Sequence, residues 1–134
     1  MTKNQETNKK FDLEDRTTDF AKRVIRLCRS LPKDSINHRL SGQAVGSAGS
    51  MGANYREAND ALGKKDFVLR MKIARKESKE AHHWLECIEE ANPKFKSRMQ
   101  ELKKECLEIK NIFSAIINKA ESKKSDSKNG NKKN

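Results

Sequence analysis

Apolar residues recur at alternating steps of three and four along four segments of the chain, and this spacing constrains the fold more than any other feature of the sequence. The segments run from Leu13 to Leu31, from Ser35 to about Leu62, from Phe67 to Ile88 and from Met99 to Ala120. Steps of three and four place side chains on one face of an α-helix, whereas a half-buried strand needs strict alternation. Because no segment shows convincing alternation, the sequence predicts an all-α protein.

Residues that favour helix ends separate the four segments. Pro32 ends the first helix, and Ser35 is a plausible N-cap for the second. Gly63 suits the left-handed position after a helix, and Asp66 can cap the third helix. The pair Asn92-Pro93 is typical of an N-cap followed by a first-turn proline. The predicted core faces include Ile36 of the second helix and Ile116 of the fourth.

Short connections between long helices favour antiparallel packing of neighbours in the sequence. We therefore expect an antiparallel up-down-up-down four-helix bundle over residues 11–120, with left-handed, near-coiled-coil packing. Only 34% of the 134 residues are hydrophobic, so the core is thin for a chain of this size. Self-association would bury further apolar surface, and a homo-oligomer is expected.

Positive charge is spread over the whole chain. The net charge is +11, of which residues 1–10 carry +2 and residues 119–134 carry +4, which leaves +5 for residues 11–118. Residues 1–10 and 121–134 lack large apolar side chains, and both tails are predicted to be disordered. The charge favours a polyanionic partner, with nucleic acid ahead of a membrane. A protein with lysine-rich ends that serve solubility is the alternative.

Three cysteines lie at wide spacing, and each falls within an apolar helical pattern: Cys28, Cys87 and Cys106. An odd number without a C-x-x-C pair favours reduced, buried thiols. The first residues contain no apolar core of a signal peptide, and no stretch approaches 18 apolar residues. The sequence therefore predicts a cytoplasmic protein without a membrane partner.

Residues 41–54, SGQAVGSAGSMGAN, hold four of the six glycines. Neither a Walker loop nor a dinucleotide fingerprint matches, because no Gly-Lys-Ser/Thr and no G-x-G occurs there. Gly42, Gly46, Gly49 and Ala53 follow one another at steps of four, three and four on one helical face, and they form the predicted packing strip. Four interior glycines cost about 4 kcal/mol relative to alanine. We expect close approach of another helix, within the bundle or on a second subunit, to offset this cost; a flexible hinge is the alternative.

Residue patterns for catalysis and metal binding are missing from the sequence. His82 and His83 are adjacent and point in different directions on a helix, and the bundle metal motif Glu-x-x-His does not occur. Cys87 follows His83 by one helical turn, but a packed thiol is the simpler interpretation. We expect no enzyme activity, no metal, no cofactor and no small-molecule substrate.

Basic side chains line up on two of the predicted helices and form the candidate nucleic-acid-binding residues. On the first helix they are Lys22, Arg26 and Arg29, and on the third they are Lys65, Lys72, Arg75, Lys76 and Lys79. Cations along a rigid face suit phosphate contacts, which give affinity without reading the base sequence. A solvated face with ion pairs along the helix is the alternative, and the sequence leaves both open. Only Trp84 and Tyr55 could stack on bases with a polar group at hand, which argues against a platform of several aromatic residues for single-stranded nucleic acid.

Three polar residues of the second helix lie on or near its apolar face: Gln43, Asn54 and Glu57. An unpaired polar group in such a place costs free energy. We therefore expect a structural polar network that sets the helix register or subunit contacts.

Residues 36–58, INHRLSGQAVGSAGSMGANYREA, resemble the second helix of the four-helix bundle proteins encoded in intervening sequences of 23S rRNA genes. The positions that match the family pattern are Leu40, Gln43, Ser47, Ala48, Ser50, Met51, Ala53, Asn54 and Glu57. Gly46 stands where the family usually has arginine, and Ala58 where it usually has glycine. The missing arginine puts the transfer of an arginine-based binding site in doubt.

The resemblance implies a small bundle that assembles as a ring, commonly a pentamer. A related branch comprises the accessory variability proteins of diversity-generating retroelements, basic rings that bind RNA and a reverse transcriptase. We therefore expect a non-enzymatic homo-oligomer that binds RNA through basic helix faces and tails. A protein-interaction scaffold, or an accessory factor for a reverse transcriptase, is the alternative.

Overall fold

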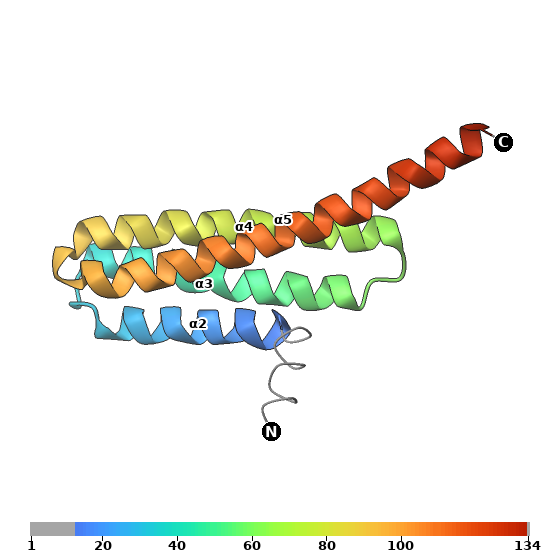
Figure 1. Cartoon of the computed structure of the whole chain (residues 1–134). Coiled ribbons are helices and arrows are strands. Elements are labelled where there is room, and N and C mark those ends of the chain that lie inside the picture. Colours follow the sequence, from blue (N-terminus) through green and yellow to red (C-terminus); the bar gives the residue numbers. More distant parts are fainter. Residues whose placement is uncertain (1–12, 134) are drawn as a thin grey trace, which may run out of the picture.

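The computed structural model describes residues 13–133 as helices and turns, and the side chains of residues 13–122. Its elements are α2 (Leu13–Ser30), α3 (Ser35–Asn59), α4 (Lys64–Ala91), the short 3-10 helix η1 (Pro93–Phe95) and α5 (Lys96–Lys133) (Figure 1). No strand occurs within this described part, so the predicted all-α class is confirmed. The predicted tail 1–10 lies outside the described residues. The predicted tail 121–134 coincides with the last part of α5 and, past residue 122, with side chains that are not described, so its disorder stays a prediction.

The four long helices form an antiparallel up-down-up-down bundle, as predicted. Each helix packs along the next one in the sequence, and α2 meets α5 more sparsely to close the bundle (Figure 1). Within residues 13–133, the backbones of α2 and α4 do not approach each other closely, and neither do those of α3 and α5, although Tyr55 of α3 reaches Phe113 of α5 with the ring centroids 5.7 Å apart. In each of these two pairs the helices therefore lie at diagonally opposite corners of the bundle. A small ligand cannot contact the outer faces of both helices of such a pair.

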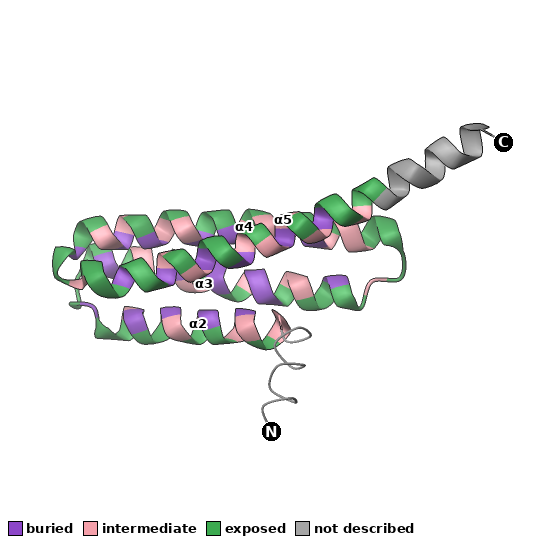
Figure 2. Cartoon of the chain, viewed as in Figure 1, coloured by how far each residue is buried: buried purple, intermediate pink, exposed green. Residues whose placement is uncertain are grey.

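One buried stripe on each helix faces the centre of the bundle (Figure 2). Fully buried large side chains from the four helices include Phe20, Leu27, Met51, Met71, Leu85, Ile109 and Phe113. Burial of each such side chain stabilises the fold by about 1.5–3 kcal/mol. The predicted faces are confirmed for most positions because the spacing of three and four matches the helical repeat.

Two predicted core positions were wrong. Ile36 is 63% exposed, and the next residue, Asn37, points into the bundle in its place. In α5 the buried face runs from Phe113 to Ile117, whereas Ile116 is only half-buried. A straight helix drifts relative to a strict 3.5-residue repeat, so a second step of four follows Phe113 where the sequence analysis placed a step of three.

Both ends of α3 differ from the prediction. Its N-cap is Asp34 and not Ser35: the Asp34 carboxylate accepts a hydrogen bond of 2.8 Å from the Asn37 backbone N–H. The helix then ends at Asn59, earlier than predicted, and leaves Leu62 fully exposed in the connection.

The start of α4 also required correction. Gly63 has an extended backbone with φ 167°, so it is not left-handed, and it precedes α4 without offering a side-chain cap. Asp66 does not cap this helix, because α4 already begins at Lys64; its carboxylate lies 3.7 Å from Arg70 instead. Pro93 does open η1, as predicted, but the Asn92 side chain does not cap η1; it donates instead to the Ile88 carbonyl oxygen in the last turn of α4.

None of the described helices combines the length and the apolar character that crossing a membrane requires.

Candidate nucleic-acid interface

Four of the five basic residues predicted on α4 line one open hollow of about 410 Å³. The hollow, called the basic hollow below, is lined by Lys72, Arg75, Lys76, Lys79, Glu80, His83 and Trp84. All seven lie between Lys72 and Trp84 of α4, whose opposite face is buried in the core, so their backbone is rigidly held. Lys65 lies near the start of the helix, exposed and outside this hollow.

The cations of the basic hollow are largely without carboxylate partners. Lys72 is the exception, because its ammonium group lies 3.1 Å from the Glu121 carboxylate of α5. Among residues 13–122, no ion pair within 4.0 Å involves Arg75, Lys76 or Lys79. These three residues therefore form none of the ion pairs along the helix that the alternative of a solvated face includes.

The basic residues predicted on α2 form a separate surface. Lys22, Arg26 and Arg29 are exposed, and Arg26 lines a hollow of about 420 Å³ together with Arg23 and Arg98. Because α2 and α4 occupy opposite corners of the bundle, the structure does not bring the two sets together. A single phosphate group cannot contact both.

Trp84 connects the basic hollow to a second one that the sequence analysis did not find. This α3–α4 hollow, of about 330 Å³, is lined by Ile36, Arg39, Leu40, Gln43 and Trp84. The Trp84 indole also contacts the His83 ring edge-on, with the ring centroids 4.8 Å apart. Arg39 is absent from the predicted binding residues because it belongs to no basic stripe on its own helix; only the packing of α3 on α4 reveals its place.

The predicted packing strip of α3 faces solvent. Its four residues are exposed, and a Cβ atom added at Gly42, Gly46 or Gly49 would meet nothing within 4 Å. Close approach of a helix of the same bundle, one of the two predicted explanations, is therefore wrong. The strip lies on the face of α3 opposite to the core, because α3 presents its buried residues to α2 and α4. Contact with a second subunit stays a prediction.

Gly52 is the glycine of this segment that another helix does contact. A Cβ atom there would lie 2.8 Å from Thr17 Oγ1 of α2, well inside van der Waals contact. The side chain of Thr17 is fixed, because its hydroxyl donates to the Glu14 carbonyl oxygen at 2.8 Å. The close approach of α2 and α3 therefore depends on Gly52, which the predicted strip did not include.

The predicted polar network of α3 does not form within one chain. Gln43 and Glu57 are exposed, and the half-buried Asn54 donates its side-chain N–H to the Ser50 carbonyl oxygen of its own helix at 2.9 Å. These residues therefore do not set the register of the bundle, and a role in subunit contacts stays a prediction.

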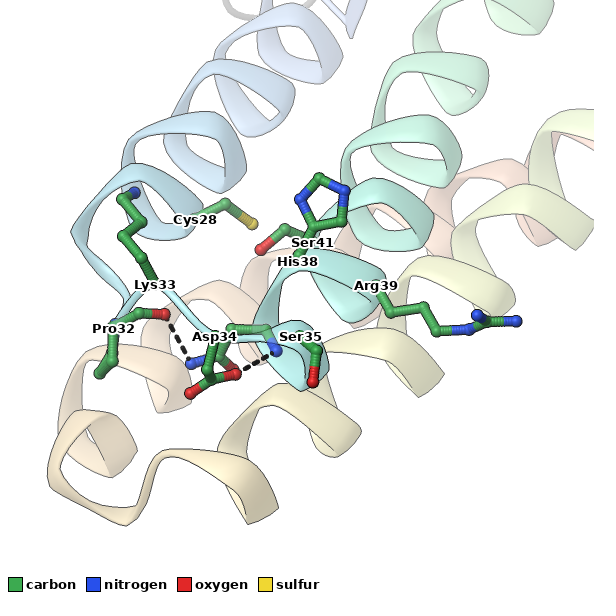
Figure 3. Close-up of a pocket in the computed structure, with 9 residues that line it drawn as sticks. Cys28, Pro32, Lys33, Asp34, Ser35, His38, Arg39 and Ser41 are labelled. Atoms are coloured by element: carbon green, nitrogen blue, oxygen red, sulfur yellow. Dashed lines mark hydrogen bonds between the residues drawn. The ribbon is translucent and has the colours of Figure 1, made fainter.

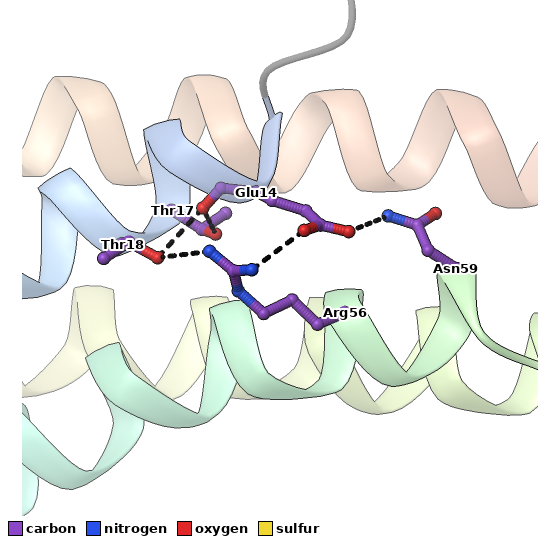
Figure 4. Close-up of polar contacts among 5 residues, drawn as sticks. All are labelled: Glu14, Thr17, Thr18, Arg56 and Asn59. Carbon is purple, nitrogen blue, oxygen red and sulfur yellow. Dashed lines mark hydrogen bonds and ion pairs between the residues drawn. The ribbon is translucent and has the colours of Figure 1, made fainter.

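A different polar cluster joins α2 to α3 (Figure 4). The Glu14 carboxylate accepts hydrogen bonds from Arg56 at 2.9 Å and from Asn59 at 2.8 Å. Arg56 also donates to the Thr18 hydroxyl at 3.1 Å. In this exposed cluster the Arg56 guanidinium is paired with the Glu14 carboxylate. Arg56 is therefore engaged in a contact between α2 and α3 and is less available to an anion than the cations of the basic hollow.

A further hollow of about 620 Å³ lies at the connection of α2 and α3 (Figure 3). Cys28 points into it beside Ser41, and Lys33, His38 and Arg39 line its walls. Burial raises the pKa of the Cys28 thiol, which therefore stays protonated at neutral pH and is a poor nucleophile. At the same hollow, the Asp34 carboxylate occupies the N-terminus of α3.

The other two thiols lie in different environments. Burial raises the pKa of the core thiol of Cys106 to about 12, and its Sγ donates to the Ser78 carbonyl oxygen at 3.2 Å. Cys87 Sγ lies 3.8 Å from His83 Nε2 on the surface of α4. Across the described residues, no three histidine, cysteine, aspartate or glutamate side chains lie in a group that could hold a metal ion.

Comparisons with known proteins agree with this geometry. The model of a family described as 23S rRNA-intervening sequence protein matches residues 9–115. The chain is also similar to the crystal structure of a protein with unknown function from the S23 ribosomal protein family of Bacteroides thetaiotaomicron VPI-5482. The two chains are 28% identical with a TM-score of 0.70, and the match covers 78% of this chain and 97% of that one. A comparison with curated proteins gives no match.

Proposed function

Because this chain belongs to the 23S rRNA-intervening sequence protein family, we propose that it is a non-enzymatic, homo-oligomeric helical bundle that binds RNA in the cytoplasm through its basic faces. Phosphate groups are the chemical target, since the basic residues offer charge and hydrogen-bond donors but no acceptors. Affinity then depends on the number of phosphates contacted and on the salt concentration.

The observation that carries the proposal is the state of Arg75, Lys76 and Lys79. These residues share one open hollow, stand on a helix anchored in the core, and form no ion pair with another described residue. Ion pairs between exposed side chains contribute little stability, so a row of aligned cations is common on protein surfaces. Alignment alone is therefore weak evidence for a bound polyanion. Alignment together with the lack of carboxylate partners favours an external polyanion.

Self-association would place several copies of the basic hollow on one particle. The small-residue strip of Gly42, Gly46, Gly49 and Ala53 supports it, because an exposed helix face without side chains lets another backbone approach closely. A ring, and a pentamer in particular, is the expected form. Linked copies bind one RNA more tightly than a single copy does, because each further contact is intramolecular.

A protein-interaction scaffold is the second candidate function, and the same open strip favours it. A helix of another protein, such as a reverse transcriptase, would then occupy the strip in place of a second copy. Recovery of one stoichiometric protein partner after nuclease treatment supports this candidate over RNA binding.

Titration of the nuclease-treated protein into a labelled structured RNA tests the proposal. We expect binding at low salt and a steep loss of affinity towards physiological salt, since each neutralised phosphate adds about 0.7–0.9 to the slope of log affinity against log salt. Affinity that does not change with salt, or no binding at any salt, rejects the proposal.

A further inference from the structure

We propose that Trp84 is a stacking site for one unpaired RNA base, so that the α4 surface prefers single-stranded RNA to duplex RNA. The inference deepens the proposed function and rests on it, because the bound class is still RNA.

The position of Trp84 distinguishes it from the rest of the basic face. Trp84 is half-buried and forms the shared wall of the basic hollow and the α3–α4 hollow. Part of its indole is therefore packed against the bundle core, whereas part remains accessible in two adjoining depressions. A ring that is held at one side and open at the other is suited to stacking, since little side-chain entropy is lost on binding.

Charges surround the indole on both helices. Lys76 and Lys79 of α4 line the hollow on one side of Trp84, and Arg39 of α3 lines the hollow on the other. Within residues 13–122, none of the three cations has a carboxylate within 4.0 Å. A nucleotide chain that crosses Trp84 could place the phosphates before and after the stacked base near cations of opposite hollows.

The other residues of the α3–α4 hollow suit the edge and face of a base. Ile36 is 63% exposed and Leu40 is partly buried, so apolar surface lies next to the indole. Gln43 is exposed at the same place and carries both a donor and an acceptor for the edge of a base. An apolar partner surface would be poorly matched to Arg39 and Gln43, whereas a base with its phosphates complements all of them.

Duplex RNA cannot use this site in the same way. Its bases are stacked inside the helix and are recognised mainly through phosphates and 2′-hydroxyl groups. The basic hollow should therefore bind both forms of RNA through phosphates, and Trp84 should add affinity only for the unpaired form.

The experiment uses the full chain with two probes, an oligouridylate of about 12 nucleotides and an RNA duplex of about 16 base pairs. Trp84 is the only tryptophan, so its fluorescence reports directly on the site. We expect the oligouridylate to quench this fluorescence and the duplex to leave it nearly unchanged. In binding assays, Trp84→Leu should lower the affinity for the oligouridylate by roughly ten-fold or more. It should change the affinity for the duplex by less than about two-fold.

Trp84→Phe and Tyr55→Leu are the matched variants. Trp84→Phe keeps an aromatic face and should restore part of the affinity, which a loss of fold would not allow. Tyr55 stacks on Phe113 with the ring centroids 5.7 Å apart, so its replacement should leave oligouridylate binding unchanged. Circular dichroism melting of each variant verifies the fold.

Three results overturn the inference alone. Equal loss of affinity for both probes in Trp84→Leu would assign Trp84 a structural role. Unchanged affinity of Trp84→Leu for both probes would show that no base stacks on Trp84, although the chain binds RNA. Fluorescence that is already shielded from a soluble quencher before RNA is added would place Trp84 in a contact between copies. Failure of the wild-type chain to bind either probe at low salt rejects the proposed function together with this inference.

Discussion

Asn37 of α3 and Asn92 at the end of α4 exchange two side-chain hydrogen bonds inside the bundle. Asn37 Nδ2 donates to Asn92 Oδ1 at 2.9 Å, and Asn92 Nδ2 donates to Asn37 Oδ1 at 2.8 Å. Asn37 also donates to the Pro32 carbonyl oxygen, and Asn92 to that of Ile88. Both residues are at most 5% exposed, so the pair ties two helix connections together without access to water.

Removal of one amide of this pair should destabilise the fold. We expect Asn37→Ala to lower the free energy of unfolding by about 2 kcal/mol, because it leaves buried groups of Asn92 unpaired. The double variant Asn37→Ala/Asn92→Ala should cost less than the sum of the single variants, as for any directly coupled pair. Urea unfolding measures all three, with the exposed Ser35→Ala as the control; strictly additive losses would contradict the coupling.

The glycines of α3 should respond to alanine with opposite signs. Gly52→Ala forces a methyl group against Thr17 and should destabilise by about 1–3 kcal/mol. Gly46→Ala adds its methyl group to open space in a helix interior and should stabilise the isolated bundle by up to about 1 kcal/mol. Thermal unfolding at low protein concentration compares them, and a loss of stability in both variants would contradict the structure.

A larger side chain at Gly46 tests self-association. Gly46→Leu has room in one chain but would separate two closely packed helices, so we expect a normally folded protein with a smaller sedimentation coefficient than wild type. Leucine at the exposed Lys104, on α5, is the control and should leave the assembly unchanged. An assembly of wild-type size for Gly46→Leu would remove the small-residue strip from the subunit contact.

Two glutamates should affect stability at opposite ends of the pH range. Burial, followed by a hydrogen bond and the charge of Glu80, raises the pKa of Glu77, so the fold favours its protonated form. That stability is present at acid pH and is lost as pH rises through the raised pKa. Glu77→Gln resembles the protonated form and should therefore raise Tm at neutral pH and change it little at acid pH.

Glu105 provides the opposite case and the matched comparison. A bidentate hydrogen bond from Arg16, with both N···O distances at 2.8 Å, lowers the pKa of the Glu105 carboxyl. The contribution of Glu105 to the stability of the fold is therefore present above the pKa of the unfolded chain. It is lost as pH falls through the lowered pKa of the folded chain. Glu105→Gln should reduce stability at neutral pH by up to about 1 kcal/mol, since Arg16 is partly exposed. Melting curves across pH in which both variants shift Tm in the same direction would contradict these assignments.

Local spacing predicted the fold well, because the helical repeat is visible in any single segment. It could not predict that Asn37 and Asn92, 55 residues apart, form a buried pair, or that Ile36 is exposed beside them. The prediction of the α3 N-cap was wrong for a similar reason. Asp34 and Ser35 are both favourable N-cap residues, and only the path of the chain after Pro32 decides between them.

The candidate site was predicted only in part. The alignment of Lys72, Lys76 and Lys79 on one face follows from their spacing, whereas the ion pair that engages Lys72 depends on the neighbouring helix α5. The contribution of Arg39 beside Trp84 depends on how α3 packs on α4. The strip at Gly46 had the right spacing for helix packing, but its spacing does not indicate whether the partner belongs to the same chain.

The central claim, that the α4 face binds RNA phosphates, is tested most directly by the salt dependence of RNA affinity in two variants of equal charge. Lys76→Gln/Lys79→Gln removes two cations of the basic hollow, and Lys94→Gln/Lys104→Gln removes two exposed lysines outside it. We expect the first variant to weaken binding and to reduce the slope of log affinity against log salt by about 2, and the second to retain nearly the wild-type slope. Equal slopes for the two variants would contradict the assignment of RNA binding to this face.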